Sequence, residues 1–455
     1  LSVVTCREQG SIGRLMAENP SRSARLATDP FADTIITIEA AGTASLPRRI
    51  GGRAVDRIVQ LTQLLADLVH PDHAIDKLAF RKSLERRAAN SVKALANDLG
   101  CYAAFASNRL GHALPARAHD LVAYLEDCEA RGLSPATASR RLASLAAIHA
   151  LLGASPSTGE TMVRDAMIGY RKRIGSAQRQ AGPLRYGPGI EAVSELDARR
   201  SDEEREAHAR RGFTLTTLLA ACDGDPPGLR DAALLSLAYD TGLRVSELLR
   251  VAVAHTGPNE AGDGSGTLFI PISKTDRTGK GAYAWISPES MRRISDWLEI
   301  GGIRGGPMFR RIAVRRAKAR PAQRPMPIHA IPYGALVTRE RVRGRKAELA
   351  KVAYAIGGSA LTPAAVRLII KRTALRAADL GLVELYGAAL EEAIAKLSTH
   401  SLRVGLTQDL FASGADAGPI AQALRWSSTA TALRYGRELA PASNATAQML
   451  RNVRR

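Results

Sequence analysis

The sequence has few cysteines, few aromatic residues and no long apolar run. Aromatic residues make up only 4% of the chain, and its four cysteines lie far apart at Cys6, Cys101, Cys128 and Cys222. Because none of them has CxxC spacing, neither a zinc site nor a disulfide framework is indicated. No apolar run approaches the roughly 18 to 20 residues that cross a bilayer. We expect no metal, no other cofactor and no membrane association.

Acidic residues are also scarce. Asp plus Glu total 44 against 64 Lys plus Arg, which gives a formal charge of +20. Such an excess is typical of a protein with a polyanionic partner, and nucleic acid is the first candidate. A basic membrane-surface protein is the alternative, but it would need a basic amphipathic segment or a lipid signal. With no hydrophobic block before the first charges, a signal peptide is not expected and a cytoplasmic location is favoured.

A chain of 455 residues predicts two or three domains. We interpret residues 1–75 as an N-terminal extension of unknown function that ends in one helix. Residues 76–180 are patterned as helices, and residues 76–108 within them are one long helix or two helices that break near Gly100. The polar, Gly- and Pro-containing residues 181–211 have the composition of a linker. Residues 212–455 form the second domain.

Two helices are well delimited by their sequence. The segment "SPATASRRLASLAAIHALLG" has Ser134 to cap a helix, Pro135 for its first turn and Gly153 at its end. The segment "LTPAAVRLIIKRTALRAADLG" begins in the same way with Thr362 and Pro363. Both predict capped helices.

Strands are expected in one short region. Residues 266–287 alternate in strand fashion on either side of a Gly-containing turn, which predicts a β-hairpin. The basic residues 304–351, with several prolines and glycines, indicate a loop-rich basic surface. The predicted fold class is therefore mainly α with a small β-sheet.

Several cations lie on the predicted helices where they could contact DNA. Arg140 and Arg141 are placed on the polar side of an apolar face, and a second cluster ends the following helix. A basic helix can enter the major groove, although a solvated helix face is the simpler explanation. The candidate DNA contacts are Arg140, Arg141, Arg171, Lys172, Arg367, Lys371 and Arg372.

A separate set of side chains is suited to phosphate chemistry without a metal. The segments "DTGLRVSELL", "SKT" and residues 398–439 supply Arg244, Lys274, His400, Arg403, Trp426 and Tyr435. Guanidinium groups can clamp non-bridging phosphate oxygens, and a tyrosine can attack phosphorus to give a covalent ester. The phenol has an unperturbed pKa of about 10, so it needs a base such as histidine. Lysine can protonate the leaving oxygen, and the indole N–H is a neutral donor.

The segments "TGLRVSELL", "HSLRVG" and "RW…RYGREL" resemble the signature boxes of the tyrosine recombinases, also called the phage integrase family. The resemblance covers residues 213–440, and residues 76–180 are less specifically similar to the family's core-binding domain. The valine at 404 and the tryptophan at 426 are most similar to Cre recombinase.

The resemblance implies a role for each candidate residue. Arg244 and Arg403 would bind the scissile phosphate, and His400 would be the general acid/base. Tyr435 would form a 3′-phosphotyrosyl link, and Trp426 would donate a hydrogen bond to a non-bridging oxygen. Two further residues would support them: Glu247 would orient the cations, and Lys274, or Lys280 across the same turn, would protonate the 5′-oxygen.

The resemblance also implies the assembly. The two domains would form a clamp around duplex DNA with paired, inverted binding elements, and four copies would act through a Holliday junction without metal or ATP. Residues 441–455 would dock on a neighbouring subunit. A bacterial or phage-encoded, nucleoid-associated protein is expected. A type IB topoisomerase, a telomere resolvase and a non-catalytic DNA-binding accessory protein are the alternatives.

Overall fold

The protein is described here by a computed structural model. It describes residues 34–39 (backbone only), 56–70, 76–107, 113–175, 180–187, 212–271, 279–436 and 449. The chain divides into two compact units, residues 48–180 and residues 1–47 with 181–455. No described helix is long and apolar enough to cross a membrane.

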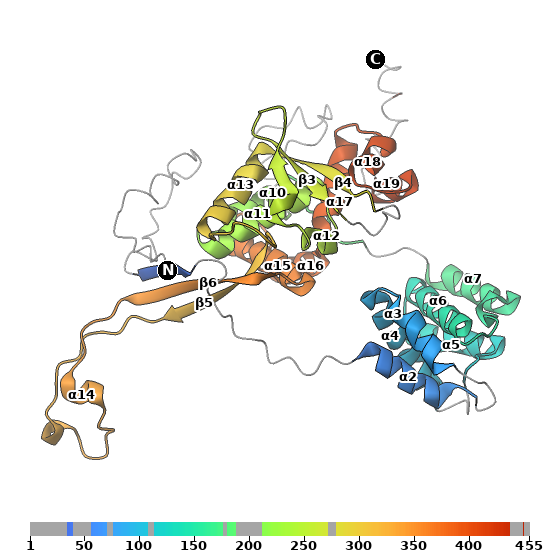
Figure 1. Ribbon diagram of the computed structural model, residues 1–455, viewed down its shortest axis with the longest axis horizontal. Coiled ribbons are helices and arrows are strands. Elements are labelled where there is room, and N and C mark those ends of the chain that lie inside the picture. Colours follow the sequence, from blue (N-terminus) through green and yellow to red (C-terminus); the bar gives the residue numbers. More distant parts are fainter. Residues whose placement is uncertain are drawn as a thin grey trace. The chain divides into compact units, whose positions relative to one another are not determined.

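The smaller unit is a helical bundle, whose elements are labelled in Figure 1. Its elements are α2 (Arg57–Leu68), α3 (Lys77–Glu85), α4 (Ala89–Ala106), α5 (Ala118–Ala130), α6 (Pro135–Leu151), η1 (Ser157–Gly159) and α7 (Thr161–Ile174). Ser134 caps α6 by accepting a hydrogen bond from the amide of Thr137, Pro135 lies in its first turn, and Gly153 follows it with φ of 73°. The predicted limits of this helix are confirmed.

Two predictions for this region differ from the structure. The break near Gly100 is wrong, because α3 ends at Glu85 and α4 continues through Gly100. Helix α2, which the predicted boundary at residue 75 leaves outside, buries Leu61 and Leu65 in the same core as Leu99 of α4. An amphipathic helix stabilises a fold by burying its apolar face. The spacing of apolar residues in the sequence does not show against which element that face packs.

The larger unit is built around α11, which is buried along nearly its whole length. The described helices of this unit, apart from two given below, are α10 (Leu215–Ala220), α11 (Pro226–Thr241), α12 (Val245–Leu248), η2 (Val253–His255), α13 (Pro288–Ile300), α15 (Pro363–Asp379), α16 (Gly387–Lys396), α17 (Ser401–Ala412), α18 (Ala417–Ala423) and α19 (Thr429–Gly436). Thr362 caps α15 by accepting from the amide of Ala365, so that predicted helix start is also confirmed.

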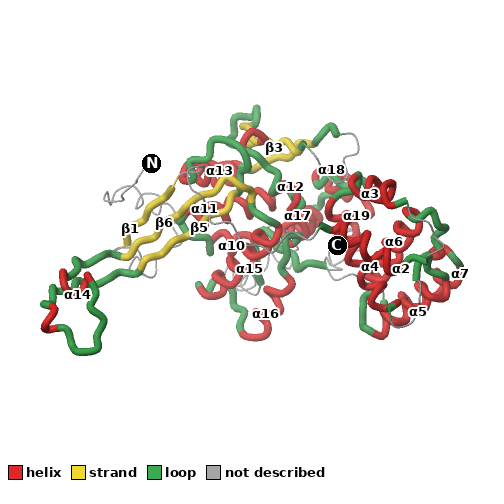
Figure 2. Tube along the Cα trace, turned by 60° about the horizontal axis from the view of Figure 1, so that its bottom comes forward, coloured by secondary structure: helices red, strands yellow, loops and turns green. Residues whose placement is uncertain are grey.

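Two small sheets complete this unit. In the first, β2 (Thr256–Pro258), β3 (Gly266–Ile270) and β4 (Ala282–Ile286) are antiparallel, which confirms the predicted hairpin. In the second, β6 (Ala350–Ala360) lies between β1 (Thr34–Glu39), which is parallel to it, and β5 (Arg310–Ala317), which is antiparallel. Together with η3 (Ile328–Ala330) and α14 (Arg339–Arg343), β5 and β6 make a long projection, seen in Figure 2. Within the predicted loop-rich surface, residues 310–317 and 350–351 are strand, which forms a β-ribbon, and residues 318–349 between them are mainly loop with two short helices.

Part of the expected linker is packed onto the larger unit. Leu184 is fully buried, and its amide donates to the carbonyl oxygen of Ser401 at 3.0 Å. Asp409 of α17 accepts from Arg185 Nε at 2.5 Å and from the amide of Tyr186 at 2.8 Å. The rest of the expected linker, residues 188–211, lies outside the described residues.

This close approach requires a glycine on α17. A Cβ atom at Gly405 would lie 1.8 Å from the carbonyl oxygen of Leu184. We predict that Gly405→Ala destabilises the larger unit by about 3 kcal/mol, since backbone cannot yield as a flexible side chain would. The matched change Gly418→Ala, on α18 with nothing within 4 Å, leaves stability unchanged or slightly higher. Thermal unfolding followed by circular dichroism measures both, and equal midpoints for the two variants would refute the packing argument.

Candidate active site

The buried guanidinium of Arg403 joins three segments of the larger unit. Arg403 lies in the first turn of α17 and is only 1% exposed. Its Nη1 donates to the carbonyl oxygen of Gly242 at 2.5 Å, and its Nη2 donates to that of Leu424 at 2.6 Å. Gly242 ends α11 in the left-handed region, where a Cβ would lie 2.3 Å from Leu424 Cδ2. Glycine at position 242 therefore lets the end of α11 approach Leu424, and the Arg403 guanidinium on α17 hydrogen-bonds to both.

Arg244 stands just beyond that turn and is held by Glu247. The Glu247 carboxylate accepts from the backbone amide of Arg244 at 3.0 Å and from its Nη1 at 2.9 Å. Glu247 is buried, whereas the side chain of Arg244 is 24% exposed. The Glu247 carboxylate thus holds the backbone amide and the Nη1 of Arg244 in place. Part of the Arg244 guanidinium remains accessible to a ligand.

The tyrosine, histidine and tryptophan predicted from the sequence meet beside Arg403. The Tyr435 hydroxyl on α19 is 2.7 Å from His400 Nε2. The Trp426 ring stacks on that of Tyr435, with centroids 5.3 Å apart and planes at 2°. The Arg403 Cζ lies 4.8 Å from the centroid of the Trp426 ring. The indole therefore contacts both the phenol and the buried cation.

Positive charge dominates the electrostatics of this site. Burial, together with Arg403 and Arg244, lowers the pKa of His400 below its ordinary value. The neutral ring can accept the phenol proton at Nε2. Burial and the neighbouring Arg244 and Arg425 lower the pKa of Arg403 to about 10, so it stays charged at neutral pH. A bound anion would offset this mutual repulsion of cations.

Arg425 is a member of this cluster that the sequence argument did not single out. It has φ of 56°, in the left-handed region that a non-glycine residue rarely adopts. Its Nη2 donates to the carbonyl oxygen of Thr241 at 3.0 Å, and burial is the main reason that its pKa is lowered. In the sequence, its position directly before Trp426 was the signal that could have identified Arg425 as part of the site.

The described residues do not decide between the two lysine candidates. Lys274 lies outside the described residues. Lys280 is exposed just before β4, between Gly279 and Gly281, which both have positive φ. The choice between the two lysines stays open.

The candidate DNA contacts fall into different environments. Lys172 and Arg367 are exposed and have no hydrogen bond or ion pair within the described part of the chain, and Lys371 is half-buried. Arg140 forms an ion pair with Asp98, and Arg171 donates to Ser139 Oγ at 2.8 Å. These contacts leave Arg140 and Arg171 partly accessible.

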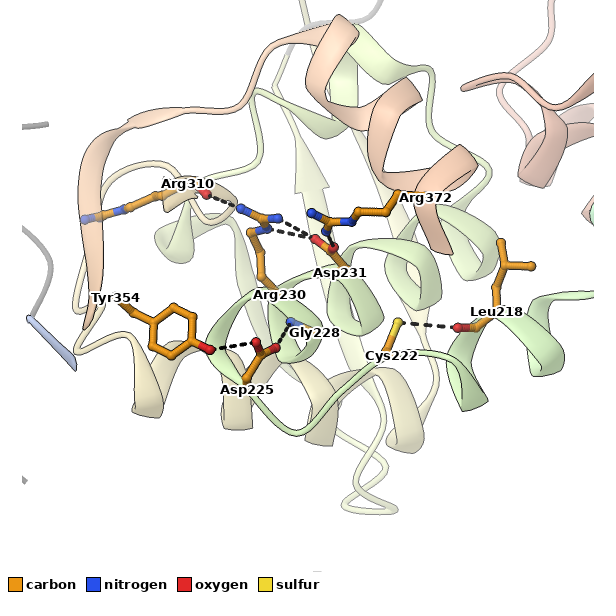
Figure 3. A network of polar contacts seen from close by, with 9 residues as sticks. All are labelled: Leu218, Cys222, Asp225, Gly228, Arg230, Asp231, Arg310, Tyr354 and Arg372. Atoms are coloured by element: carbon orange, nitrogen blue, oxygen red, sulfur yellow. Dashed lines mark hydrogen bonds and ion pairs between the residues drawn. The ribbon is translucent and has the colours of Figure 1, made fainter. Parts of the chain in front are cut away.

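Two of these candidates have structural partners. The exposed position predicted for Arg141 is wrong: it is 8% exposed and donates to the Tyr124 hydroxyl at 3.3 Å. Arg372 donates to the buried carboxylate of Asp231 at 2.5 Å, beside Arg230 (Figure 3). A buried carboxylate needs such partners, so this contact is a structural role for Arg372.

Comparisons with known proteins found one family match and several similar chains. Residues 80–154 match the family described as phage integrase, N-terminal SAM-like domain. The chain is 28% identical to a tyrosine recombinase XerD of Caulobacter vibrioides over 48% of this chain and 64% of that protein, somewhat less than two thirds of its length. It is 27% identical to a tyrosine recombinase XerD of Rhizobium meliloti, over 54% of this chain and 72% of that protein.

Solved structures with similar chains include recombinases bound to DNA. The Tn1549 transposon integrase in complex with circular intermediate DNA matches with a TM-score of 0.47 and 13% identity, over 82% of this chain and 98% of that one. The XerH site-specific recombinase bound to a palindromic difH substrate matches with a TM-score of 0.45 and 13% identity, over 87% and 95%. In sequence the chain is thus similar to tyrosine recombinases, and its residues 80–154 match a domain of the phage integrases.

The lowered pKa of His400 predicts a pH-dependent stability. Because the folded state binds the proton less readily than the unfolded chain, stability is lost as pH falls below the unfolded value of about 6.5. We expect His400→Gln to make the fall in Tm between about pH 7 and pH 5 shallower. The matched change of an exposed histidine, His329→Gln, leaves that fall as it is in the native chain. A His400→Gln profile parallel to the native one would contradict the burial argument.

Proposed function

We propose that the protein is a site-specific DNA recombinase that cleaves and rejoins duplex DNA through a 3′-phosphotyrosyl intermediate. The observation that carries this proposal is the 2.7 Å contact between the Tyr435 hydroxyl and His400 Nε2, next to the buried Arg403. A phenol, a neutral base and fixed cations are the groups that metal-free phosphoryl transfer requires. The relationship to tyrosine recombinases supports the same chemistry.

In this mechanism the two arginines hold the scissile phosphate. Arg244 and Arg403 place positive charge where the phosphorane develops its negative charge, and Glu247 keeps Arg244 in position. His400 takes the phenol proton as the Tyr435 oxygen forms its bond to phosphorus. The bond from phosphorus to the 5′-oxygen breaks, and Lys274 or Lys280 supplies the proton to that leaving oxygen. Rejoining runs the same steps in reverse.

Trp426 is proposed to have two tasks. Its ring stacks on Tyr435 and so orients the phenol, and its N–H is a neutral donor to a non-bridging oxygen. A tryptophan at this place is the feature that supports a Cre-like variant of the active site.

The assembly follows from the proposed chemistry. The helical unit and the catalytic unit would grip duplex DNA with paired, inverted elements, through exposed cations such as Lys172 and Arg367. Four copies would bring two sites together and pass through a Holliday junction. A bacterial or phage protein that acts on the cytoplasmic nucleoid fits this role.

A covalent adduct tests the nucleophile. We predict that the native protein, incubated with genomic DNA and denatured, retains DNA that resists detergent and is released by protease. Tyr435→Phe retains none, because it lacks the attacking oxygen. The control is Tyr386→Phe, which removes the hydroxyl of an exposed tyrosine. We expect this variant to retain as much DNA as the native chain.

The same trapping experiment separates the alternatives. Adduct formation that persists in Tyr435→Phe, or stops when a chelator is added, would contradict the mechanism. The absence of any adduct in the native chain would support a non-catalytic DNA-binding protein. Sequencing of the trapped ends, together with a two-site exchange assay, distinguishes recombination from relaxation or hairpin formation.

Arg425 is proposed as a positioning residue for this reaction. It bridges the Trp426 turn to Thr241 next to Arg244, and its left-handed backbone is strained. We predict that Arg425→Gly keeps or raises the Tm, since glycine adopts this conformation freely, while it slows adduct formation about tenfold. A purely structural role would instead lower the Tm and leave the rate of the folded enzyme unchanged.

A further inference from the structure

The basic ribbon holds an unusual share of the protein's charge. We call the segment from β5 to β6, residues 310–360, the arm. Residues 310–351 hold thirteen Lys and Arg against two Glu, which is a net +11 of the formal +20 of the chain. None of the proposed catalytic residues lies in the arm. This concentration of charge therefore needs an explanation of its own.

The base of the arm is fixed to α11. The Tyr354 hydroxyl of β6 donates to Asp225 Oδ2 at 2.9 Å, and Asp225 also caps α11 by accepting from the amide of Gly228 at 2.8 Å. Arg230 Nη1 donates to the carbonyl oxygen of Arg310 at 3.2 Å (Figure 3). Tyr354 is also buried. The arm therefore projects from a firm root and is not a loose loop.

Beyond the root the cations far outnumber their partners. The carboxylate of Glu340 is shared between Arg345 at 2.9 Å and Arg320 at 3.5 Å. Many of the arm's cations are exposed, and their side chains form no hydrogen bond or ion pair with any other described residue. They include Arg315, Arg316, Arg324, Arg339, Arg343 and Lys346.

The register brings some of these like charges together. Arg315 pairs with Ala353 and Lys351 pairs with Ala317, so Arg315 and Lys351 are diagonal neighbours on one face of the ribbon. Like charges at such positions destabilise a ribbon unless an anion lies between them. The isolated pairings of Arg320 with Glu348 and of Gln323 with Arg345 extend the ladder outward.

The length of the arm is comparable to the length of one turn of duplex DNA. Extended chain from residue 310 to residue 323 spans about 43 Å at roughly 3.3 Å per residue. One turn of duplex DNA is roughly 34 to 36 Å long, with one negative charge per about 1.7 Å of axis. A second copy of the chain fits less well, because it has the same +20 charge and would repel the arm.

We propose that the arm is a second DNA-binding element, which lies along the phosphates of duplex outside the site of cleavage. The exposed apolar side chains near its tip, Ile328, Tyr333 and Leu336, can contact groove walls or insert between base steps. This inference takes from the proposed function only that DNA is the substrate. The arm adds affinity that does not depend on base sequence, and it lengthens the DNA that one subunit covers.

The salt dependence of binding to a random-sequence duplex tests the arm. The arm variant carries Arg324→Gln, Arg343→Gln and Lys346→Gln, and its matched control carries Arg292→Gln, Arg304→Gln and Lys396→Gln on exposed positions elsewhere in the unit. Fluorescence anisotropy gives the slope of log K against log salt for a duplex of about 60 base pairs. We expect the arm variant to lose up to roughly 2.7 of that slope, at about 0.9 per phosphate contact, and the control less than one third of that loss.

The outcomes separate the arm from the chemistry. Equal slope losses in the two variants, or no loss in the arm variant, would overturn the proposal. Loss of self-association in sedimentation with an unchanged slope would also overturn it, in favour of a second copy as the partner. Circular dichroism verifies that each variant is folded. Because the slope does not depend on Tyr435, failure to trap a covalent adduct would reject the recombinase chemistry and leave the arm result intact.

Discussion

The candidate site depends on one buried cation. Arg403 is almost fully buried, and its two Nη groups donate to carbonyl oxygens that end two other segments, at Gly242 and at Leu424. Those segments lead directly to Arg244 and to Trp426, so a single side chain sets the distance between Arg244 and the stacked aromatic pair. Burying a guanidinium is costly unless it is hydrogen-bonded, and these carbonyls supply that compensation.

The charges around Arg403 are arranged for a ligand and not for the greatest stability. Arg244, Arg403 and Arg425 interact with one carboxylate, that of Glu247, and their mutual repulsion helps to lower the pKa of Arg403 and of Arg425. A cluster with excess positive charge is stabilised when an anion binds. The same field favours the neutral form of His400, so the groups that would bind a phosphate also prepare the base. Affinity and proton transfer thus depend on the same residues.

The sequence predicted what is local and missed what depends on tertiary contact. The caps of α6 and α15 and the β3–β4 hairpin follow from short-range rules at Ser134, Thr362 and the Gly-containing turn. The roles of Arg141 and Arg372 could not be read in this way. Each lies on a helix with other exposed cations, and only the fold places Tyr124 or the buried Asp231 beside it.

The ribbon was missed for a related reason. Its prolines, glycines and arginines have the composition of a loop, and β6 becomes a strand because β5 and β1 hydrogen-bond to its two edges. Residues from the N-terminal region and from the middle of the chain therefore share one sheet, a pairing that no local pattern indicates.

One hydrogen-bond donor of the buried Arg403 has no acceptor in the described part of the chain. Among the described residues the Nε–H of Arg403 is buried and has no acceptor, although both Nη groups of the same guanidinium have one. A buried donor without a partner costs about 1 to 3 kcal/mol of folding free energy. Such a donor in a native structure therefore needs an explanation. An oxygen of a bound phosphate would supply the missing acceptor and the missing negative charge together. In the proposed reaction the scissile phosphate would therefore satisfy a donor that the free protein leaves without an acceptor.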